Sequence, residues 1–153
     1  MRAIVQRVTR AQVRVQSHVV GSIGRGLLLL VGFSTEDTPD SGRALAEKIV
    51  GLRLFDNEQG RMDHSILETG GEVLVVSQFT LYGDCRKGRR PSYTRAASPE
   101  NARPLYEAFL DSLRDLLRGH DVNVSQGRFQ AMMEVESVND GPVTLLLDSE
   151  KVF

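Results

Sequence analysis

The chain has 153 residues, of which 41% are hydrophobic and 25% charged, and its formal net charge is −1. These values are ordinary for one globular domain, so we expect a single domain over residues 1–153. The net charge argues against broad electrostatic attraction to nucleic acid, and no apolar run is long enough to cross a bilayer. The lone Cys85 cannot form an internal disulfide, and no apolar signal region opens the chain. We therefore expect a cytoplasmic protein with no membrane role and no DNA partner.

The first third of the chain predicts β-strands followed by a helix. Alternating or continuous apolar patterns predict four strands, over residues 2–9, 12–16, 19–23 and 26–33. Gly24-Arg25-Gly26 supplies a turn between the last two, so we expect an antiparallel meander. Pro39 and the apolar positions that follow at helical spacing predict a helix over about residues 39–53.

The rest of the chain predicts further strands and one more helix. A long basic loop separates the strand that ends at Ser77 from a helix that begins after Ser98. We expect the remaining strands at residues 54–55, 73–77, 122–125, 132–138 and 143–147. The last two are predicted to be joined by a tight turn that contains Gly141 and Pro142. Antiparallel strands with two substantial helices define an α+β domain.

Two segments carry most of the functional information. Ser77 to Leu81 follows a buried apolar run, so its hydroxyls and free N–H groups are expected at a strand end. Asn139 to Thr144 contains a rigid Gly-Pro pair between two strands. Taken singly, each has an ordinary structural explanation, as hydroxyls that satisfy local backbone groups or as a common β-turn. Their joint occurrence is the informative feature.

Together these segments resemble the D-aminoacyl-tRNA deacylases, which hydrolyse the ester between a D-amino acid and the terminal adenosine of tRNA. The resemblance runs nearly end to end and also includes Ala3 to Val8, Val31-Gly32, Lys48-Ile49, Lys87 to Ser92 and Gly127 to Phe129. The chain departs from the family at Gln130, where Gly is usual, and at Tyr93, where Phe is commoner. Gln130 is expected to reshape a pocket wall near Phe129.

The resemblance implies a fold and an assembly. The fold would have antiparallel β-sheets in a two-sheet, barrel-like core, with the two main helices packed on one side. The enzyme would be a homodimer in which the Gly-Pro turn, cis in the family, enters the partner's active site. Gly141 and Pro142 would then reject L-aminoacyl esters by a steric clash and admit D-aminoacyl or glycyl esters. Glycyl-tRNA mischarged on alanine tRNA is therefore expected as a second substrate.

The ester to be broken is already activated, so positioned backbone donors can supply much of the catalysis. The residues expected to be catalytic are Ser77, Gln78, Phe79 and Thr80. The main chain of residues 78–80 would stabilise the oxyanion. No histidine lies near Thr80 in the sequence, so we expect its hydroxyl to position water and not to attack. The resemblance also implies assistance from the 2′-hydroxyl of the substrate.

The loop over residues 82–98 is expected to contact the acceptor end of aminoacyl-tRNA. The residues expected to bind tRNA are Lys87, Arg89, Arg90 and Phe129. A loop kept soluble by its charge is an equal alternative on sequence grounds. Phe79 and Phe129 are candidates to hold the terminal adenine, because unpaired bases are commonly held by aromatic faces.

Other chemistry has little support in the sequence. The three histidines are scattered, so we expect neither a metal nor a cofactor. The main rival interpretation is a non-catalytic RNA-binding module that uses the basic loop. A third is an editing domain detached from a synthetase, although no linker or second domain is apparent. The Gly-Pro pair favours the deacylase, because a binding module has no need of a rigid backbone wedge.

Overall fold

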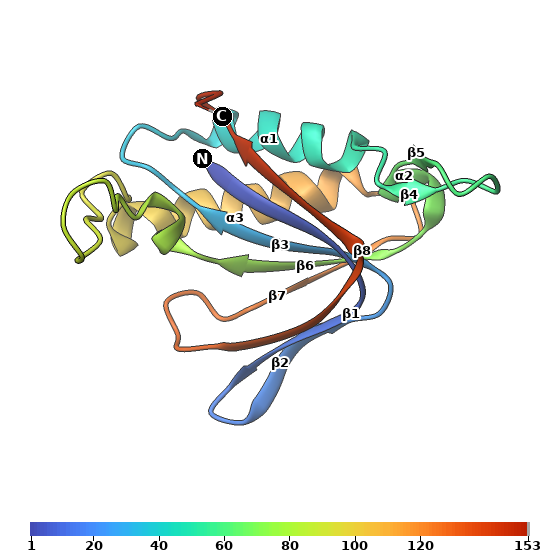
Figure 1. Cartoon of the computed structure of the whole chain (residues 1–153), viewed down its shortest axis with the longest axis horizontal. Helices are drawn as coiled ribbons and strands as arrows, with labels where there is room; N and C mark the ends of the chain where they lie inside the picture. The colour runs from blue at the N-terminus through green and yellow to red at the C-terminus, as the bar shows by residue number, and fades with distance from the viewer. Residues whose placement is uncertain (153) are drawn as a thin grey trace.

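The computed structural model describes residues 1–152. A six-stranded sheet curves into a nearly closed barrel, and α1 (Pro39–Gly51) and α3 (Pro99–Leu116) lie together on one side of it (Figure 1). The strands of this sheet are β1 (Arg2–Val15), β2 (His18–Ile23), β3 (Gly26–Gly32), β6 (Glu72–Ser77), β7 (Asn123–Gln126) and β8 (Glu134–Asp148). The expected α+β class, barrel-like core and one-sided helices are confirmed. None of the described helices is long and apolar enough to cross a membrane.

Smaller elements connect the main ones. They are β4 (Phe55–Asp56), β5 (Met62–His64), the short helix α2 (Ile66–Thr69) and the 3₁₀ helix η1 (Phe79–Tyr82). The strands β4 and β5 pair antiparallel and form the second, two-stranded sheet. The helix η1 begins directly after β6, so the segment from Ser77 to Leu81 consists of a strand end and most of one tight helical turn.

The predicted meander at the start of the chain is wrong. Residues 2–15 form one bent strand, which carries β3 along its first half and β2 along its second half on the same edge. Val8 pairs with Gly26, and Ala11 pairs with Ile23. β2 and β3 therefore lie end to end along the same edge of β1, with a short kink between them, and do not pair with each other. The alternation of buried side chains breaks at the exposed residues 9–10 and then resumes. That break marks a bend within β1 and not the strand boundary that the pattern predicts.

The expectation of purely antiparallel sheets also needs correction. β6 runs parallel to both of its neighbours, pairing through Val75 with Leu29 of β3 and through Val73 with Val124 of β7. Each of these connections contains a long helix, α1 or α3, which carries the chain back to the end where the previous strand started. Antiparallel pairing is confined in the main sheet to the partners of β1.

The predicted hairpin at the end of the chain is instead a bulge in one long strand. Gln6 of β1 pairs with Thr144 of β8 and Val8 pairs with Asn139, so residues 140–143 stand opposite Arg7 alone. β1 offers a pairing partner to both halves of β8, so they stay in line and the extra residues project as a bulge. The Gly141–Pro142 peptide bond within it is cis.

Two hydrophobic clusters lie on opposite faces of the curved sheet. The larger joins α1 and α3 to the sheet, with Ile49 and Phe109 each 1% exposed against residues such as Leu29 and Val75. The smaller fills the inside of the barrel and includes Val8, Val13, Ile23, Leu28, Leu74 and Val76. Because both faces of β6 are covered, its end is held firmly, and Ser77 emerges beside the start of α3.

Candidate active site

A pocket of about 660 Å³ opens where β3 and β6 end and α3 begins. The expected site residues Ser77, Gln78, Phe79, Thr80 and Phe129 all line it, together with Gln130. The rest of the wall consists of small or apolar side chains, among them Phe33, Ala97, Pro99, Ala102, Met132 and Met133. The fold thus brings residues 77–80 and 129–130 to one cavity.

The backbone of Phe79 and Thr80, which line this pocket, has two unpaired donors. The N–H of Gln78 donates to the Val31 carbonyl at 2.7 Å, and that of Leu81 donates to the Gln78 carbonyl at 3.2 Å. Between them, the N–H groups of Phe79 and Thr80 have no acceptor within residues 1–152. The first N–H groups of a helix lack partners within the helix. The expected set of three donors is therefore reduced to two, because Gln78 completes the sheet.

No lining side chain of this pocket in the described chain is ionisable. The Gln78 amide donates to the Thr80 hydroxyl, and both groups are exposed. No described cluster of histidine, cysteine or carboxylate side chains could hold a metal ion. The pocket offers two hydroxyls, two side-chain amides and free backbone N–H groups, which suits stabilisation of an oxyanion and gives little scope for acid-base catalysis by side chains.

The two aromatic candidates differ in their surroundings. The Phe129 ring lies 5.5 Å from the Tyr106 ring, and the Arg103 guanidinium lies over it at 4.9 Å. Burial raises the pKa of Tyr106, whose hydroxyl donates to the Val75 carbonyl at 3.0 Å. Phe79 is 57% exposed and meets Tyr93 edge-on at 5.1 Å. The Phe79 ring is thus more accessible for stacking on a nucleotide base, whereas the Phe129 ring is packed into the pocket wall.

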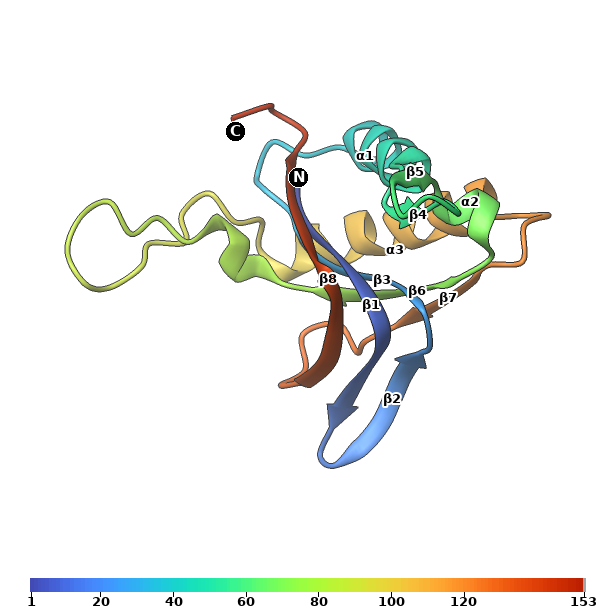
Figure 2. The ribbon, with the colours of Figure 1, turned by 45° about the vertical axis from the view of Figure 1, so that its right-hand side comes forward.

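The basic loop leaves the end of η1 and returns at Ala97 in the pocket wall, so its base adjoins the pocket mouth. Asp84 and Ser92 exchange backbone hydrogen bonds at 2.8 and 3.0 Å and close this base. Beyond them the loop projects away from the helices and the sheet (Figure 2, yellow-green). The loop therefore extends well beyond the residues that line the pocket (Figure 2).

The cations of this loop fall into two groups. Arg86 pairs with Asp84 at 2.6 Å, and hydrogen bonds from Arg86 lower the pKa of that carboxyl. Arg95 pairs with Glu150 at 2.8 Å. The other three cations form no ion pair with any described residue, and these are Lys87, Arg89 and Arg90.

The bulge that carries Gly141 and Pro142 is exposed and lies outside the pocket of its own chain. The bulge stands opposite Arg7 of β1, and Arg7 lies four residues along β1 from Ala3, which is level with Ser77. Both β3 and β1 lie between β6, which ends at Ser77, and β8, which carries the bulge. These steps amount to about 13 Å along the strands and about 14 Å across them. Within one chain the two informative segments are therefore not brought together.

Comparison with known proteins identifies the family. The family model described as D-Tyr-tRNA(Tyr) deacylase matches residues 4–148. The chain belongs to this family of hydrolases. A protein of Symbiobacterium thermophilum named D-aminoacyl-tRNA deacylase is 58% identical over 100% of this chain and 99% of its own length. One of Fervidobacterium nodosum with the same name is 55% identical over 100% of both chains.

Solved structures agree on the fold. A structure described as the c-Myc DNA Unwinding Element Binding Protein is 41% identical, with a TM-score of 0.90, over 97% of this chain and 98% of that one. A probable eukaryotic D-amino acid tRNA deacylase is 19% identical, with a TM-score of 0.81, over 95% and 97% of the two chains. The second likeness supports the deacylase fold alone.

Sequence reasoning missed the residue that holds the bulge of this deacylase-family chain. Arg7 is 6% exposed, and its guanidinium donates to the carbonyls of Asp140 at 3.3 Å and Leu54 at 2.7 Å. It also pairs with the carboxylates of Asp140 and Asp56, each at 3.2 Å. A signal was present, because Arg7 follows Ala3 and Val5 on the inward side of a strand, where a charge needs partners.

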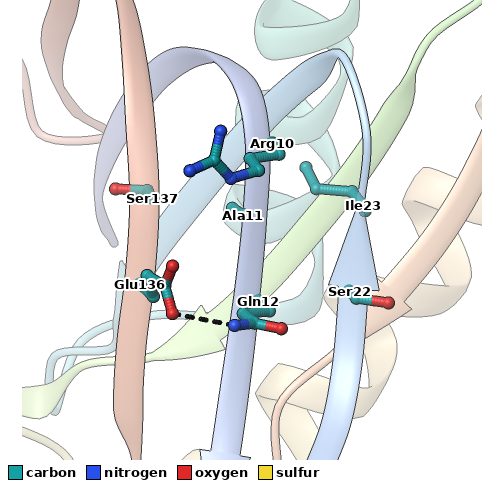
Figure 3. A pocket seen from close by; sticks show the side chains of 7 residues that line it. All are labelled: Arg10, Ala11, Gln12, Ser22, Ile23, Glu136 and Ser137. Atoms are coloured by element: carbon teal, nitrogen blue, oxygen red, sulfur yellow. Dashed lines mark hydrogen bonds between the residues drawn. The ribbon is translucent and has the colours of Figure 1, made fainter.

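A second, smaller hollow of about 160 Å³ lies between β8, β1 and β2 (Figure 3). Gln12 donates to Glu136 across it at 2.8 Å, and Arg14 pairs with the same carboxylate at 3.2 Å. The hydrogen bond from Gln12 lowers the pKa of Glu136, with further help from Arg14 and Arg10. These polar groups satisfy one another, and none of the expected site residues lies there.

Proposed function

We propose that the protein hydrolyses the ester bond of D-aminoacyl-tRNA and releases free D-amino acid and tRNA. One observation carries this proposal: the pocket at the end of β6 holds two unpaired N–H groups and no ionisable side chain among its lining residues. An activated ester needs little more than a fixed oxyanion site, whereas an amide or a phosphoester would need further groups. Family membership and the names of the relatives support the same substrate.

In the proposed reaction, water adds to the ester carbonyl carbon while Phe79 and Thr80 donate their N–H groups to the developing oxyanion. The C–O bond to the 3′ oxygen then breaks, and the proton lost by water passes to that oxygen through the neighbouring 2′-hydroxyl of the substrate. The Thr80 hydroxyl, which accepts from Gln78, orients the water. A covalent role for Thr80 is not needed, because the pocket wall offers no base to activate it.

The proposed chiral selection requires two copies of the chain. The Gly141–Pro142 bulge lies far from the pocket of its own chain and is exposed, as a group that enters a partner's pocket would be. In a two-fold homodimer each chain would receive the other's bulge. An L side chain would strike that backbone, while the hydrogen of a D-aminoacyl or glycyl ester would fit. Glycyl-tRNA mischarged on alanine tRNA is thus a second proposed substrate.

The acceptor end of the tRNA would enter past the basic loop. Lys87, Arg89 and Arg90 would contact phosphates, since they form no ion pair with any described residue of their own chain. The exposed Phe79 is the better candidate to stack on the terminal adenine, because Phe129 is packed against Tyr106 in the pocket wall. We place this activity in the cytoplasm, where aminoacyl-tRNA is used.

The decisive experiment is single-turnover release of tyrosine from matched D- and L-tyrosyl-tRNA, with excess enzyme and chelator in place of metal. Release from the D ester alone is the expected result. Equal release from both esters would exclude the chiral gate, and release from neither would exclude the deacylase. Sedimentation of the same sample is expected to report a dimer, and a fully active monomer would exclude the cross-subunit gate.

A second candidate is a non-catalytic nucleic-acid-binding module. The basic loop favours it, as does the name of the solved relative that is 41% identical. This candidate predicts that uncharged tRNA binds as tightly as D-tyrosyl-tRNA and that no tyrosine is released. The release experiment above therefore separates the two functions.

A further inference from the structure

The last two residues of η1 are held by one side chain from the start of β1. The Arg2 guanidinium donates to the Leu81 carbonyl at 2.9 Å. Its central carbon also lies 4.6 Å from the centre of the Tyr82 ring. Leu81 and Tyr82 end the four-residue helix whose first two residues present the unpaired N–H groups. A single planar cation therefore contacts both the backbone and the ring at the end of η1.

Arg2 is itself fixed from β8. Its Nε donates to the Asp148 carboxylate at 2.9 Å, and the Asp148 side chain is 1% exposed. Arg2 and Asp148 are also directly paired in the sheet, so the pairing of the strands holds the two side chains next to each other. A movement of the guanidinium would leave a buried carboxylate without its counter-charge, which is strongly unfavourable. The contact between Arg2 and η1 is thus built on a rigid support.

Tyr82 gives the contact a second anchor. Its side chain is 3% exposed, and the Arg95 guanidinium lies 6.0 Å from the ring centre. Burial raises the pKa of Tyr82, so the ring stays neutral and can accept the cations at its face. Because η1 is a single 3₁₀ turn, Leu81 and Tyr82 lie within one turn of the Phe79 and Thr80 donors. A shift at the end of η1 therefore also moves these donors.

We propose that Arg2 is a positioning residue that holds η1 so that the N–H groups of Phe79 and Thr80 converge on one oxygen. This inference rests on the proposed function, because it assigns Arg2 a purpose through those donors. Arginine suits the task better than lysine, since a planar guanidinium can bond a carboxylate and a carbonyl in its plane while its face covers a ring. An ammonium group has no flat face to offer the ring.

The test compares Arg2→Gln, Arg2→Lys and Asp148→Asn with the unmodified protein and with Arg43→Gln. The control removes an exposed arginine that pairs with Glu47 on α1 at 3.2 Å, away from the pocket. Three quantities are measured for each: the single-turnover rate on D-tyrosyl-tRNA, the affinity for uncharged tRNA, and amide hydrogen exchange. The informative amides are those of Leu81 and Gly83, which donate to the carbonyls of Gln78 and Thr80.

Arg2→Gln and Asp148→Asn are expected to lower the rate about 10- to 100-fold, since small displacements of catalytic groups have effects of this size. Arg2→Lys should recover part of the loss. Exchange at Leu81 and Gly83 should accelerate about tenfold, while exchange in β3 and the tRNA affinity stay within about twofold of the unmodified values.

Three outcomes would overturn the inference. The first is unchanged amide exchange at Leu81 and Gly83 in both Arg2→Gln and Asp148→Asn. The second is an unchanged deacylation rate in these variants when the unmodified enzyme is active. The third is an equal acceleration of amide exchange in β3, which would make Arg2 a general stabilising residue. Should the unmodified protein fail to release D-tyrosine, the proposed function fails instead. The exchange measurement would then still decide whether Arg2 holds η1.

Discussion

The Nε atom of Arg7 lies 3.2 Å from the Asp140 carboxylate, and this ion pair joins the middle of β1 to the bulge of β8. The same guanidinium donates to the Asp140 carbonyl, so it contacts both the side chain and the backbone just before Gly141. Side-chain bonds close the other end of the bulge, where Asn139 accepts from the Val143 N–H at 3.0 Å and donates to Thr144 at 2.9 Å. The exposed Gly141–Pro142 segment is thereby held in one conformation.

Arg7→Gln is expected to loosen this bulge and reduce chiral selection. The substitution removes the counter-charge of two carboxylates and leaves the Leu54 carbonyl without its donor, so we expect a loss of about 2 kcal/mol in the free energy of unfolding. The ratio of single-turnover rates on D- and L-tyrosyl-tRNA should fall at least tenfold. An unchanged ratio in the folded variant would contradict a role for Arg7 in the gate, and Arg53→Gln, which breaks an exposed pair, serves as the control.

Phe79→Pro is expected to lower the deacylation rate about 100-fold relative to Phe79→Ala. Both variants lose the aromatic ring, but only proline also removes a proposed oxyanion donor, and one such donor is typically worth this much. Proline is well tolerated at the first position of a helix, which Phe79 occupies in η1. Single-turnover assays on D-tyrosyl-tRNA measure the difference. Equal rates for the two variants would show that the Phe79 N–H is not used.

The triple variant with Lys87, Arg89 and Arg90 replaced by glutamine is expected to bind uncharged tRNA more weakly and with less dependence on salt. Each phosphate contact contributes about 0.7 to 0.9 to the slope of log affinity against log salt, so the slope should fall by about 2 to 3. Titrations at several salt concentrations measure it. The same slope in the variant would favour a loop that is merely solvated, and the paired cations Arg43 and Arg118 provide control substitutions.

Asp37→Asn is expected to destabilise the protein in a manner that depends on pH. Burial opposes ionisation of Asp37, but hydrogen bonds from the Met1 ammonium and from Ser34 prevail and lower its pKa below the ordinary 3.8. A lowered folded-state pKa contributes stability above the ordinary value, and that contribution is lost as pH falls through the folded value. Urea denaturation should give a loss of about 3 kcal/mol at pH 7 that shrinks below about pH 4. A loss independent of pH would contradict this account.

The matched control for this prediction is Asp63→Asn. Asp63 pairs with Arg53 at 3.1 Å, but its side chain is 50% exposed. Exposed pairs contribute at most about 1 kcal/mol, so this variant should stay close to the unmodified protein at every pH.

Gln130→Gly is expected to stabilise the protein or leave it unchanged. Gln130 has a φ of 65°, in the left-handed region that costs a side-chain-bearing residue about 1 kcal/mol. Glycine removes that strain but loses more backbone entropy on folding, so the net gain should lie between about 0 and 1 kcal/mol. Thermal unfolding measures it. A loss greater than 1 kcal/mol would show that the Gln130 side chain makes a compensating contact in the pocket wall.

Local patterns predicted the elements better than their pairing. The helix that begins at Pro39 and the one that begins after Ser98 follow from proline, capping residues and apolar spacing, which act within a few residues. The direction of β6 could not be predicted in the same way. A buried run such as Val73 to Val76 pairs equally well in either direction, and only the crossover helices decide that it runs parallel to β3.

The local sequence of the bulge predicts a hairpin for a related reason. Asn139 to Pro142 has the composition of a tight turn, and nothing local reveals that β1 continues past it. The long partner strand β1 keeps both halves of β8 in line, and Arg7 binds Asp140 at the start of the bulge.

The sequence by itself determined the family, the strand end at Ser77 and part of the pocket lining, namely residues 77–80 and 129–130, because short-range patterns and a family resemblance carry that information. Only the tertiary structure decided which backbone N–H groups remain unpaired. Gln78 is taken by Val31 of a neighbouring strand, while Phe79 and Thr80 start a helix and keep theirs. Hydrogen bonds between distant segments depend on strand register, which is set by the packing of the whole sheet.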